Sequence, residues 1–416
     1  MGFRSDSPRV ARRTPIRLIV AGLAWPPETF IARLLQRLAS NGIEVTVATD
    51  RSPREPWAQK ARLKWLWAPA WYGPAPLLYL RLAGTALAAL LRSPRSFAVL
   101  ARSISRNILW STSRFQMWNR TLPYVGRDWD VLYIPWNLAA VLHLPLFEMG
   151  RPVVISCRGH QINIAPHNRL RGDLERPLAV TFEKAAAVHC VSEHIRGKAT
   201  GMGLDPAKGR VIRPAVDPAF FRPASGRAAP NGAIRIVTTA SLSWRKGHEY
   251  AISAIHRLVS QGITATFTIV GEGRERARLL YTIRDLGLEG RVLLPGRLDP
   301  KGVRDELMRS DVFLLPSLSE GISNSALEAM ACGLPVVTTD CGGMREAVTD
   351  GVEGFVVPVR DPEALAGALA RLARDPALRA NMGQAARARV EREFTLDEQG
   401  RRFVELYQDV VSHWPA

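Results

Sequence analysis

The stretch Leu314–Thr338, LLPSLSEGISNSALEAMACGLPVVT, constrains the fold of this chain more than any other. Its first residues form a short apolar run that predicts a buried strand, and Pro316 ends that strand. A polar loop follows, and from Ser325 onward the Ser-x-x-Glu pattern predicts a capping box at the start of a helix. Gly333 predicts a left-handed helix end, after which Pro335 begins another strand. The stretch therefore predicts a strand–loop–helix–strand unit of a parallel α/β sheet.

Two carboxylates and a set of loop amides fall at the ligand-binding edge of this unit. Glu320 lies in the loop after the strand, and Glu328 lies on the helix. Open parallel sheets bind ligands at the carboxyl ends of their strands. The amides of Ser323, Asn324 and Ser325 would point out of the helix N-terminus, where they could seat a phosphate. A structural role is open here, because Glu328 could complete the capping box and Glu320 could be a solvated loop residue.

The spacing Glu-x7-Glu within EGISNSALEAMACGLPVV resembles the signature of the retaining nucleotide-sugar glycosyltransferases of family 4. Members of that family typically read EG(F/I/L)(G/S/P)(N/L)xxLEAMAxGxPVV in this place. The resemblance implies that Glu320 contacts hydroxyls of the transferred sugar and that Glu328 binds the ribose of the nucleotide. It also implies the GT-B fold, an α/β architecture in which two Rossmann-like domains face each other across a cleft.

Length and motif order indicate how such a fold would divide the chain, since 416 residues suggest two or three domains. We expect residues 1–224 to form an acceptor-binding Rossmann-like domain with a basic, tryptophan-rich insert at about 51–127. Residues 225–395 would form the nucleotide-sugar-binding Rossmann-like domain, and residues 396–416 a helix that packs back on the first domain. Ala224–Gly232 is polar, contains Pro and Gly, and is the expected linker.

Cysteine usage and the N-terminus predict a cytosolic chain. The four cysteines show no metal-ligand spacing and are expected to be reduced structural thiols. Arg12-Arg13 before an apolar stretch superficially resembles an export signal, but the stretch is short and lacks a small-residue cleavage site. It therefore predicts the first strand, and no apolar run reaches the length of about 18 residues that a transmembrane helix needs.

The net charge of +18 is concentrated in one region and needs a partner. Residues 51–127 carry many Arg and Lys but only one acidic residue, Glu55, and several tryptophans lie among these charges. The apolar run Leu77–Leu91 is interrupted by Arg81. This composition predicts an interfacial amphipathic element on an anionic membrane, with ordinary solvated helix faces as the alternative. Nucleic acid is not expected as a partner, because no recognised binding motif accompanies the charge.

The loop Ser241–Gly247, SLSWRKG, resembles the GRLxxxKG motif of the same family. The resemblance assigns Lys246 to the donor diphosphate, for which an ammonium is a suitable point charge. Ser241 stands where the family has an arginine, and Arg245 could compensate for that change. A solvated lysine at a helix start is the alternative for Lys246.

In the first domain, Cys157-Arg-Gly-His160 resembles the FRG variant of the family and implies that Arg158 and His160 face the donor sugar and the acceptor. A structural loop histidine is an equally open interpretation of His160. Pro-Pro-Glu-Thr-Phe-Ile at 26–31 resembles the SETFI-type loop of exopolysaccharide members.

Three glycines complete the predicted donor site. Gly22 follows the first strand, and Gly271 and Gly273 follow the strand that ends at Val270. A residue without Cβ allows the backbone to approach a ligand closely.

These motifs predict a hexosyltransferase-type enzyme that moves a sugar from a nucleotide sugar to a polyprenyl-linked or other saccharide acceptor. By resemblance it would retain anomeric configuration and serve exopolysaccharide or cell-surface polysaccharide synthesis, on the inner face of the plasma membrane. We expect no cofactor and no metal, because Lys246, Arg245 and the loop amides can oppose the leaving-group charge. The alternatives are a glycosyltransferase with a soluble acceptor and a non-catalytic scaffold of the same fold.

Overall fold

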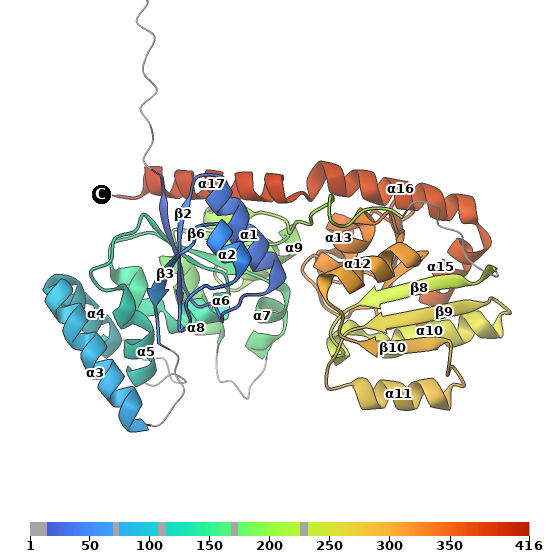
Figure 1. The fold of residues 1–416 in the computed structure, drawn as a ribbon, viewed down its shortest axis with the longest axis horizontal. Coiled ribbons are helices and arrows are strands. Elements are labelled where there is room, and N and C mark those ends of the chain that lie inside the picture. The colour runs from blue at the N-terminus through green and yellow to red at the C-terminus, as the bar shows by residue number, and fades with distance from the viewer. Residues whose placement is uncertain (1–14, 70–74, 107–113, 168–173, 225–231, 416) are drawn as a thin grey trace, which may run out of the picture.

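The computed structural model describes residues 15–69, 75–106, 114–167, 174–224 and 232–415, and it contains two α/β domains (Figure 1). The first domain is built on a seven-stranded sheet of order β3-β2-β1-β4-β5-β6-β7, and the second on a six-stranded sheet of order β10-β9-β8-β11-β12-β13. Neighbouring strands are parallel in both sheets. The predicted pair of Rossmann-like domains is confirmed.

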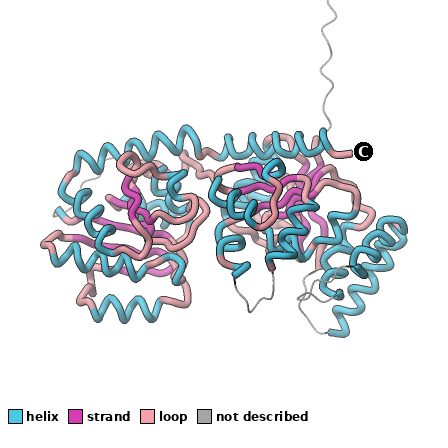
Figure 2. The backbone as a smooth tube through the Cα atoms, turned by 180° about the vertical axis from the view of Figure 1, so that it is seen from behind, coloured by secondary structure: helices cyan, strands magenta, loops and turns pink. Residues whose placement is uncertain are grey.

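Helices lie on both faces of each sheet, as the reverse view in Figure 2 shows, so the central strands are apolar on both sides. The strands of the first domain are β1 (Arg17–Val20), β2 (Glu44–Thr49), β3 (Lys64–Trp67), β4 (Val131–Ile134), β5 (Val153–Cys157), β6 (Ala187–Cys190) and β7 (Gly209–Val211). Its helices are α1 (Thr29–Ser40), α2 (Pro56–Lys60), α3 (Ala75–Arg92), α4 (Pro94–Arg106), α5 (Arg114–Thr121), α6 (Asn137–Leu142), α7 (Gly159–Asn163), α8 (Glu175–Lys184) and α9 (Glu193–Gly201).

The second domain repeats this alternation of strands and helices. Its strands are β8 (Ile234–Thr239), β9 (Ala265–Val270), β10 (Val292–Gly296), β11 (Val312–Leu315), β12 (Val336–Thr339) and β13 (Gly354–Val357). Its helices are α10 (His248–Ser260), α11 (Arg276–Asp285), α12 (Pro300–Arg309), α13 (Asn324–Ala331), α14 (Met344–Ala347), α15 (Pro362–Arg374) and α16 (Pro376–Glu393). Asp and Pro residues begin α12, α15 and α16, because an Asp side chain accepts a first-turn amide and Pro needs no donor there.

The chain crosses between the domains twice. Val216 and Phe221 already pack in the core of the second domain, so the first crossing precedes the boundary expected at residue 224. Most of the expected linker, residues 225–231, lies outside the described residues. The second crossing follows α16, where Thr395 forms a backbone bridge to Val216 and caps α17 (Leu396–His413). Helix α17 then runs along the first domain, as expected for the C-terminal helix (Figure 1).

Aromatic packing fixes α17 to the first domain. Phe403 and Tyr407 are fully buried, and their rings lie 5.9 and 6.0 Å from the ring of Tyr133 on β4. The ring of Phe403 also lies 4.7 Å from that of His189 on β6. The same cluster contains the apolar face of α1, so α17 completes the core of a domain that lies more than 180 residues earlier in the sequence.

Within the basic insert, β3 is the edge strand of the first sheet. Helices α3, α4 and α5 form a small subdomain beside this edge (Figure 1). Residues of α3, α4 and α5 share an apolar cluster of their own, which includes Leu100, Ile104 and Met117. Helix α3 spans the predicted apolar run and turns several leucines outward. Within the described ranges, no helix combines the length and the apolar character needed to cross a bilayer.

Replacement of Phe403 should show how far the first domain depends on α17. Because the side chain is fully buried, Phe403→Ala should lower the free energy of unfolding by about 3–5 kcal/mol. Val411→Ala is the matched control on the same helix, because Val411 is 38% exposed, and it should stay within about 0.5 kcal/mol of wild type. Denaturant unfolding followed by tryptophan fluorescence measures both, and equal shifts would contradict this account of α17.

Candidate active site

The predicted strand–loop–helix–strand unit is present as β11, α13 and β12, but α13 begins earlier than the sequence suggests. Ser323 is the N-cap, and its hydroxyl accepts a hydrogen bond from the amide of Ala326 at 3.4 Å. The predicted capping box from Ser325 to Glu328 is therefore wrong. Glu328 lies in the second turn, too far along the helix to accept a hydrogen bond from the amide of the capping residue. The amides of Asn324 and Ser325 lie in the first turn, which leaves them without intrahelical partners.

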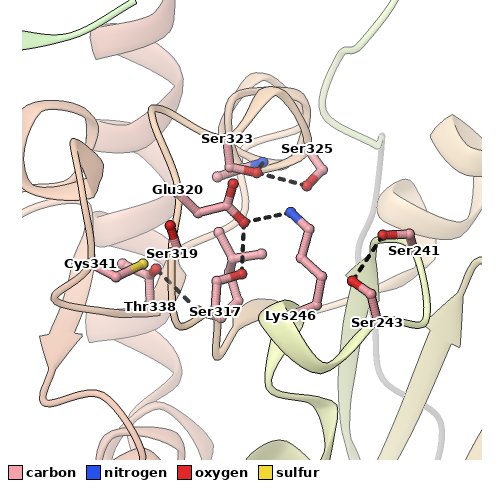
Figure 3. Close-up of polar contacts among 12 residues, drawn as sticks. Ser241, Ser243, Lys246, Ser317, Ser319, Glu320, Ser323, Ser325, Thr338 and Cys341 are labelled. Carbon is pink, nitrogen blue, oxygen red and sulfur yellow. Dashed lines mark hydrogen bonds and ion pairs between the residues drawn. The ribbon is translucent and has the colours of Figure 1, made fainter. Parts of the chain in front are cut away.

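Glu320 and Lys246 form an ion pair at the end of β11. Lys246 Nζ lies 2.5 Å from Glu320 Oε1, and the Ser317 hydroxyl donates to the same oxygen at 2.7 Å. Figure 3 shows the two charged groups facing each other below Ser323 and Ser325. Glu320 is only 8% exposed, so both charges are held in a partly desolvated position. This arrangement is typical of a preorganised ligand site, because its charged groups are already held in position when a charged ligand binds.

Local chain geometry explains why these two loops meet. Gly247, directly after Lys246, has a φ of 63° and packs so closely that a Cβ would overlap the Pro316 carbonyl oxygen. The amide of Leu318 also donates to the carbonyl of Arg245 at 2.8 Å. The two residues of the Lys-Gly motif therefore have different roles. Lys246 supplies the charge, and Gly247 permits the backbone contact that brings this charge to Glu320.

Glu328 lies on the side of α13 that faces the first domain. Its carboxylate is 3.8 Å from the guanidinium of Arg33 on α1, so the pair spans the two domains. Burial raises the pKa of Glu328 to about 7, and the charge of Arg33 lowers it in part. The cavity beside it, of about 500 Å³, is also lined by Ser325 and Gly271.

A second cavity of about 500 Å³ lies directly between the domains. Arg158, which follows β5, lies over the rings of Phe30 (4.8 Å) and Trp136 (5.7 Å) and so has a fixed position. His160, at the start of α7, is exposed on the wall of the same cavity. Glu320, Arg245 and Asn324 approach from the second domain. Five of the predicted site residues are therefore brought to one cleft, which the carboxyl ends of both sheets form.

Asn324 lies where the two cavities meet, since it lines both of them. Its side-chain oxygen is buried without a hydrogen-bond partner among the described residues. Buried polar atoms are rarely left unpaired in proteins, so this oxygen is a candidate acceptor for a ligand group.

The three predicted glycines have contacts or positions that the sequence did not indicate. A Cβ on Gly271 would overlap the carbonyl oxygen of Ala240, and one on Gly273 would overlap that of Leu242. Both glycines therefore allow close approach between two loops of the protein itself, although Gly271 also lines the cavity beside Glu328. Gly22, with a φ of 71°, lines a different cavity within the first domain. Sequence alone could not distinguish contact with a ligand from contact within the chain.

Two further site residues were not predicted from the sequence. Glu28 lines both cavities, and burial raises the pKa of its carboxyl, with Arg158 acting in the opposite direction. It lies within the Pro-Pro-Glu-Thr-Phe-Ile segment, which was a signal for it. Asn163 donates to the carbonyl of Glu320 and to the hydroxyl of Ser319, both at 3.2 Å. No local pattern indicated this contact, because it forms only when the domains meet.

The raised pKa of Glu328 predicts a pH-dependent stability. Between about pH 4.5 and pH 7 the folded protein holds a proton on this carboxyl that the unfolded chain has lost, so stability falls as pH rises through this range. The Glu328→Gln variant lacks this loss. As pH rises from about 4.5 to 7, the free energy of unfolding of the variant minus that of wild type should therefore increase by about 2–3 kcal/mol. Denaturant unfolding at several pH values measures the difference, and a constant difference would mean that Glu328 is ionised throughout.

Two family models match consecutive parts of the chain, one in each domain. One described as Glycosyltransferase Family 4 matches residues 27–220, and one described as Glycosyl transferases group 1 matches residues 225–389. The chain is 34% identical over 314 residues to the putative colanic acid biosynthesis glycosyltransferase WcaL of Salmonella typhimurium, covering 74% of this chain and 75% of the relative. It is 36% identical over 217 residues to the amylovoran biosynthesis glycosyltransferase AmsK of Erwinia amylovora, covering 51% of this chain and 53% of that protein.

Solved structures share the fold. HepE of Anabaena in complex with UDP-glucose superposes with a TM-score of 0.68 at 18% identity, covering 95% of this chain and all of that one. Sucrose-phosphate synthase from Thermosynechococcus elongatus gives a TM-score of 0.72 at 19% identity, covering 95% of this chain and 99% of that one. The motifs at Glu320, Glu328 and Lys246, the paired parallel sheets and the extent of the match to WcaL lead to one conclusion: the chain belongs to the family 4 glycosyltransferases and has the GT-B fold.

Proposed function

We propose that this glycosyltransferase moves a sugar, with retention of anomeric configuration, from a nucleoside diphosphate sugar to a lipid-linked saccharide during exopolysaccharide synthesis. The observation that carries the proposal is the convergence of Glu320 and the first turn of α13 with Arg158 and His160 in one cleft, where Lys246 is paired with Glu320. The names of WcaL and AmsK support a role in polysaccharide synthesis. The complexes of HepE with UDP-glucose and with UDP support a nucleoside diphosphate sugar as the donor.

The chemical task of this reaction is to stabilise the leaving group. When the bond between the anomeric carbon and the β-phosphate oxygen breaks, negative charge grows on the diphosphate. In our proposal Lys246 and Arg245 oppose this charge, together with the amides of Asn324 and Ser325. Glu320 already orients the Lys246 ammonium through one hydrogen bond. Little reorganisation would therefore be needed for the remaining N–H groups of Lys246 to donate to a diphosphate. These groups would act without a metal.

The remaining site residues would position the substrates. Glu320 would hold hydroxyls of the transferred sugar, because its second carboxylate oxygen stays available beside the ion pair. Glu328 would accept hydrogen bonds from the ribose. Arg158 and His160 line the opposite wall and would face the donor sugar and the acceptor.

The outer surface of the insert supports a membrane-associated acceptor. Leu77, Leu80, Leu87 and Leu91 on α3 are 42%, 71%, 58% and 75% exposed, and their spacing of three, seven and four residues puts them on one helix face. Exposed apolar patches of this kind mark interaction sites in proteins. Residues 51–127, which include this face, carry many basic residues and only Glu55 as an acid, so we propose that the protein lies peripherally on an anionic membrane.

Replacement of Lys246 tests the leaving-group proposal. Lys246→Ala should reduce turnover by about 10²–10³-fold, the usual effect of losing one contact that stabilises developing charge. The matched control is Lys301→Ala, because Lys301 is 72% exposed on α12 and pairs only with Asp305 among the contacts described. The rates of sugar transfer and of slow donor hydrolysis by each variant measure the effect. Near-normal turnover of the Lys246 variant would refute its role at the diphosphate.

The two glutamates should separate by role. Glu328→Ala should mainly weaken binding of the nucleoside diphosphate, because it removes an acceptor for the ribose. Glu320→Ala should leave that affinity nearly intact and damage transfer, because it acts on the sugar. Calorimetric titration and turnover assays test the division, and equal losses of nucleotide affinity would rule it out. Glu328→Gln isolates the effect of the carboxylate charge, since Ser323 rather than Glu328 caps the helix.

Vesicle binding tests the membrane proposal. The protein should co-sediment with anionic vesicles, bind weakly to neutral ones and be only partly released by high salt. Reversal of Arg81, Arg95, Arg102 and Arg106 to Glu should abolish binding without unfolding, since all four are exposed and each basic residue near the surface contributes about 1 kcal/mol. Arg92 is unsuitable for this test, because its guanidinium donates to the Val125 carbonyl at 2.9 Å.

A second set of variants separates the apolar contribution. Leu80→Ser with Leu91→Ser should remove the salt-resistant part of binding, because these are the most exposed leucines of α3. Tyr281→Ser, 70% exposed on α11 of the second domain, is the control and should bind like wild type. If wild type stays in the supernatant with anionic vesicles at low salt, the acceptor is soluble and the insert is a solvated surface.

A further inference from the structure

A cavity of about 530 Å³ lies within the first domain, next to the interdomain cleft. It shares Leu23 and Ala24 with the cavity that contains Arg158 and Glu320, so the two spaces are neighbours. One side of the cavity is formed by the carboxyl ends of β1 and β2 and the other by α5 of the basic insert. No motif in the sequence pointed to this space except Gly22, which lines it.

The cavity contains an arginine that the protein does not neutralise. Arg120, on α5, lines the cavity, and its Nε is buried without a hydrogen-bond partner among the described residues. Within those residues the guanidinium also has no carboxylate within ion-pair distance. Burial lowers the pKa of Arg120, but an arginine stays protonated at neutral pH. Arg120 as a whole is half-buried. A partly desolvated cation without a partner is costly, so such a group is expected where a ligand supplies the anion.

The neighbouring polar groups do not supply a countercharge. The Nδ1–H of His143 donates to the Ala139 carbonyl at 2.7 Å. Burial lowers the pKa of His143 to about 4, with a smaller contribution from Arg120, so the ring is neutral at pH 7. Asp50 also lines the cavity, but its carboxylate lies 4.0 Å from the guanidinium of Arg51, a second lining arginine. The lining therefore carries a net positive charge at the end where Arg120 lies.

We propose that this cavity is the subsite for the phosphate or diphosphate of the acceptor, with the half-buried Arg120 as its anchor. The proposal rests on the proposed function, for which it supplies the place of the acceptor's anionic group. A guanidinium donates two parallel hydrogen bonds to phosphate oxygens, and burial strengthens them. The position fits this role, because the cavity borders the cleft on one side and the insert with the exposed leucines of α3 on the other.

Titration with two diphosphates tests the subsite. Farnesyl diphosphate and inorganic pyrophosphate are titrated calorimetrically into the full-length Lys246→Ala protein, in which phosphate binding at the donor site is weakened. Adding Arg120→Met should weaken the binding of both by about tenfold to hundredfold, the scale of lost charged hydrogen bonds. Adding Arg114→Met instead should leave both affinities unchanged, because Arg114 is exposed at the start of the same helix.

The comparison of the two ligands identifies the source of the phosphate. Farnesyl diphosphate that binds at least about tenfold tighter than pyrophosphate indicates a prenyl carrier, whereas equal affinities indicate a soluble phosphorylated acceptor. Either result, combined with the loss in Arg120→Met, supports the subsite. Binding that is absent, or that Arg120→Met and Arg114→Met affect equally, overturns it.

Thermal stability distinguishes a ligand-binding role of Arg120 from a structural one. Arg120→Met should not lower the melting temperature, because methionine replaces a half-buried charge that has no partner to lose among the described residues. A marked decrease would show that Arg120 has a structural role and would overturn the proposal. Failure of the proposed function would appear instead as absent sugar transfer and absent donor hydrolysis by the wild-type enzyme, neither of which the diphosphate titration measures.

Discussion

The Lys246–Glu320 ion pair depends on a backbone contact that only glycine permits. Gly247 packs against the Pro316 carbonyl, and this contact joins the loop after β8 to the loop after β11. With the loops joined, Lys246 reaches Glu320 and the first turn of α13 lies beside both (Figure 3). A larger side chain at 247 would separate the loops and with them the charges. The electrostatics of the site therefore rest on the packing of two backbone segments.

The same loop also carries the contact between the domains. Asn163 donates to the Glu320 carbonyl, and Gly159 packs so closely on Gly321 that a Cβ would lie 2.8 Å from its amide nitrogen. Farther away, Glu346 accepts hydrogen bonds from the first amides of α9, each at 3.0 Å, and α17 extends from the second domain onto the first. Any movement between the domains must consequently move the residues that we expect to hold the sugar. The Glu320 loop and the relative position of the domains are thus mechanically connected.

The errors of sequence interpretation have a common physical origin. Both Ser323 and Ser325 can cap a helix, and the choice of Ser323 follows from how the Glu320 loop enters α13. Gly271 and Gly273 have the freedom expected of glycines at a ligand, and they also pack against Ala240 and Leu242, which the sequence did not indicate. In each case the residue type was interpreted correctly, whereas its partner was set by a segment distant in sequence.

The sequence by itself determined the strand–loop–helix–strand unit around Glu320 and the position of this residue at the carboxyl end of a parallel strand, because hydrophobic periodicity and turn residues act over short distances. It also determined the family, through contiguous motifs around Lys246 and Glu320. Only the tertiary structure decided which charges meet. Arg33 reaches Glu328 across the cleft, while the Nε of Arg120 is buried without a hydrogen-bond partner among the described residues. Such pairing and burial depend on contacts between elements far apart in the chain, and no local pattern of residues encodes them.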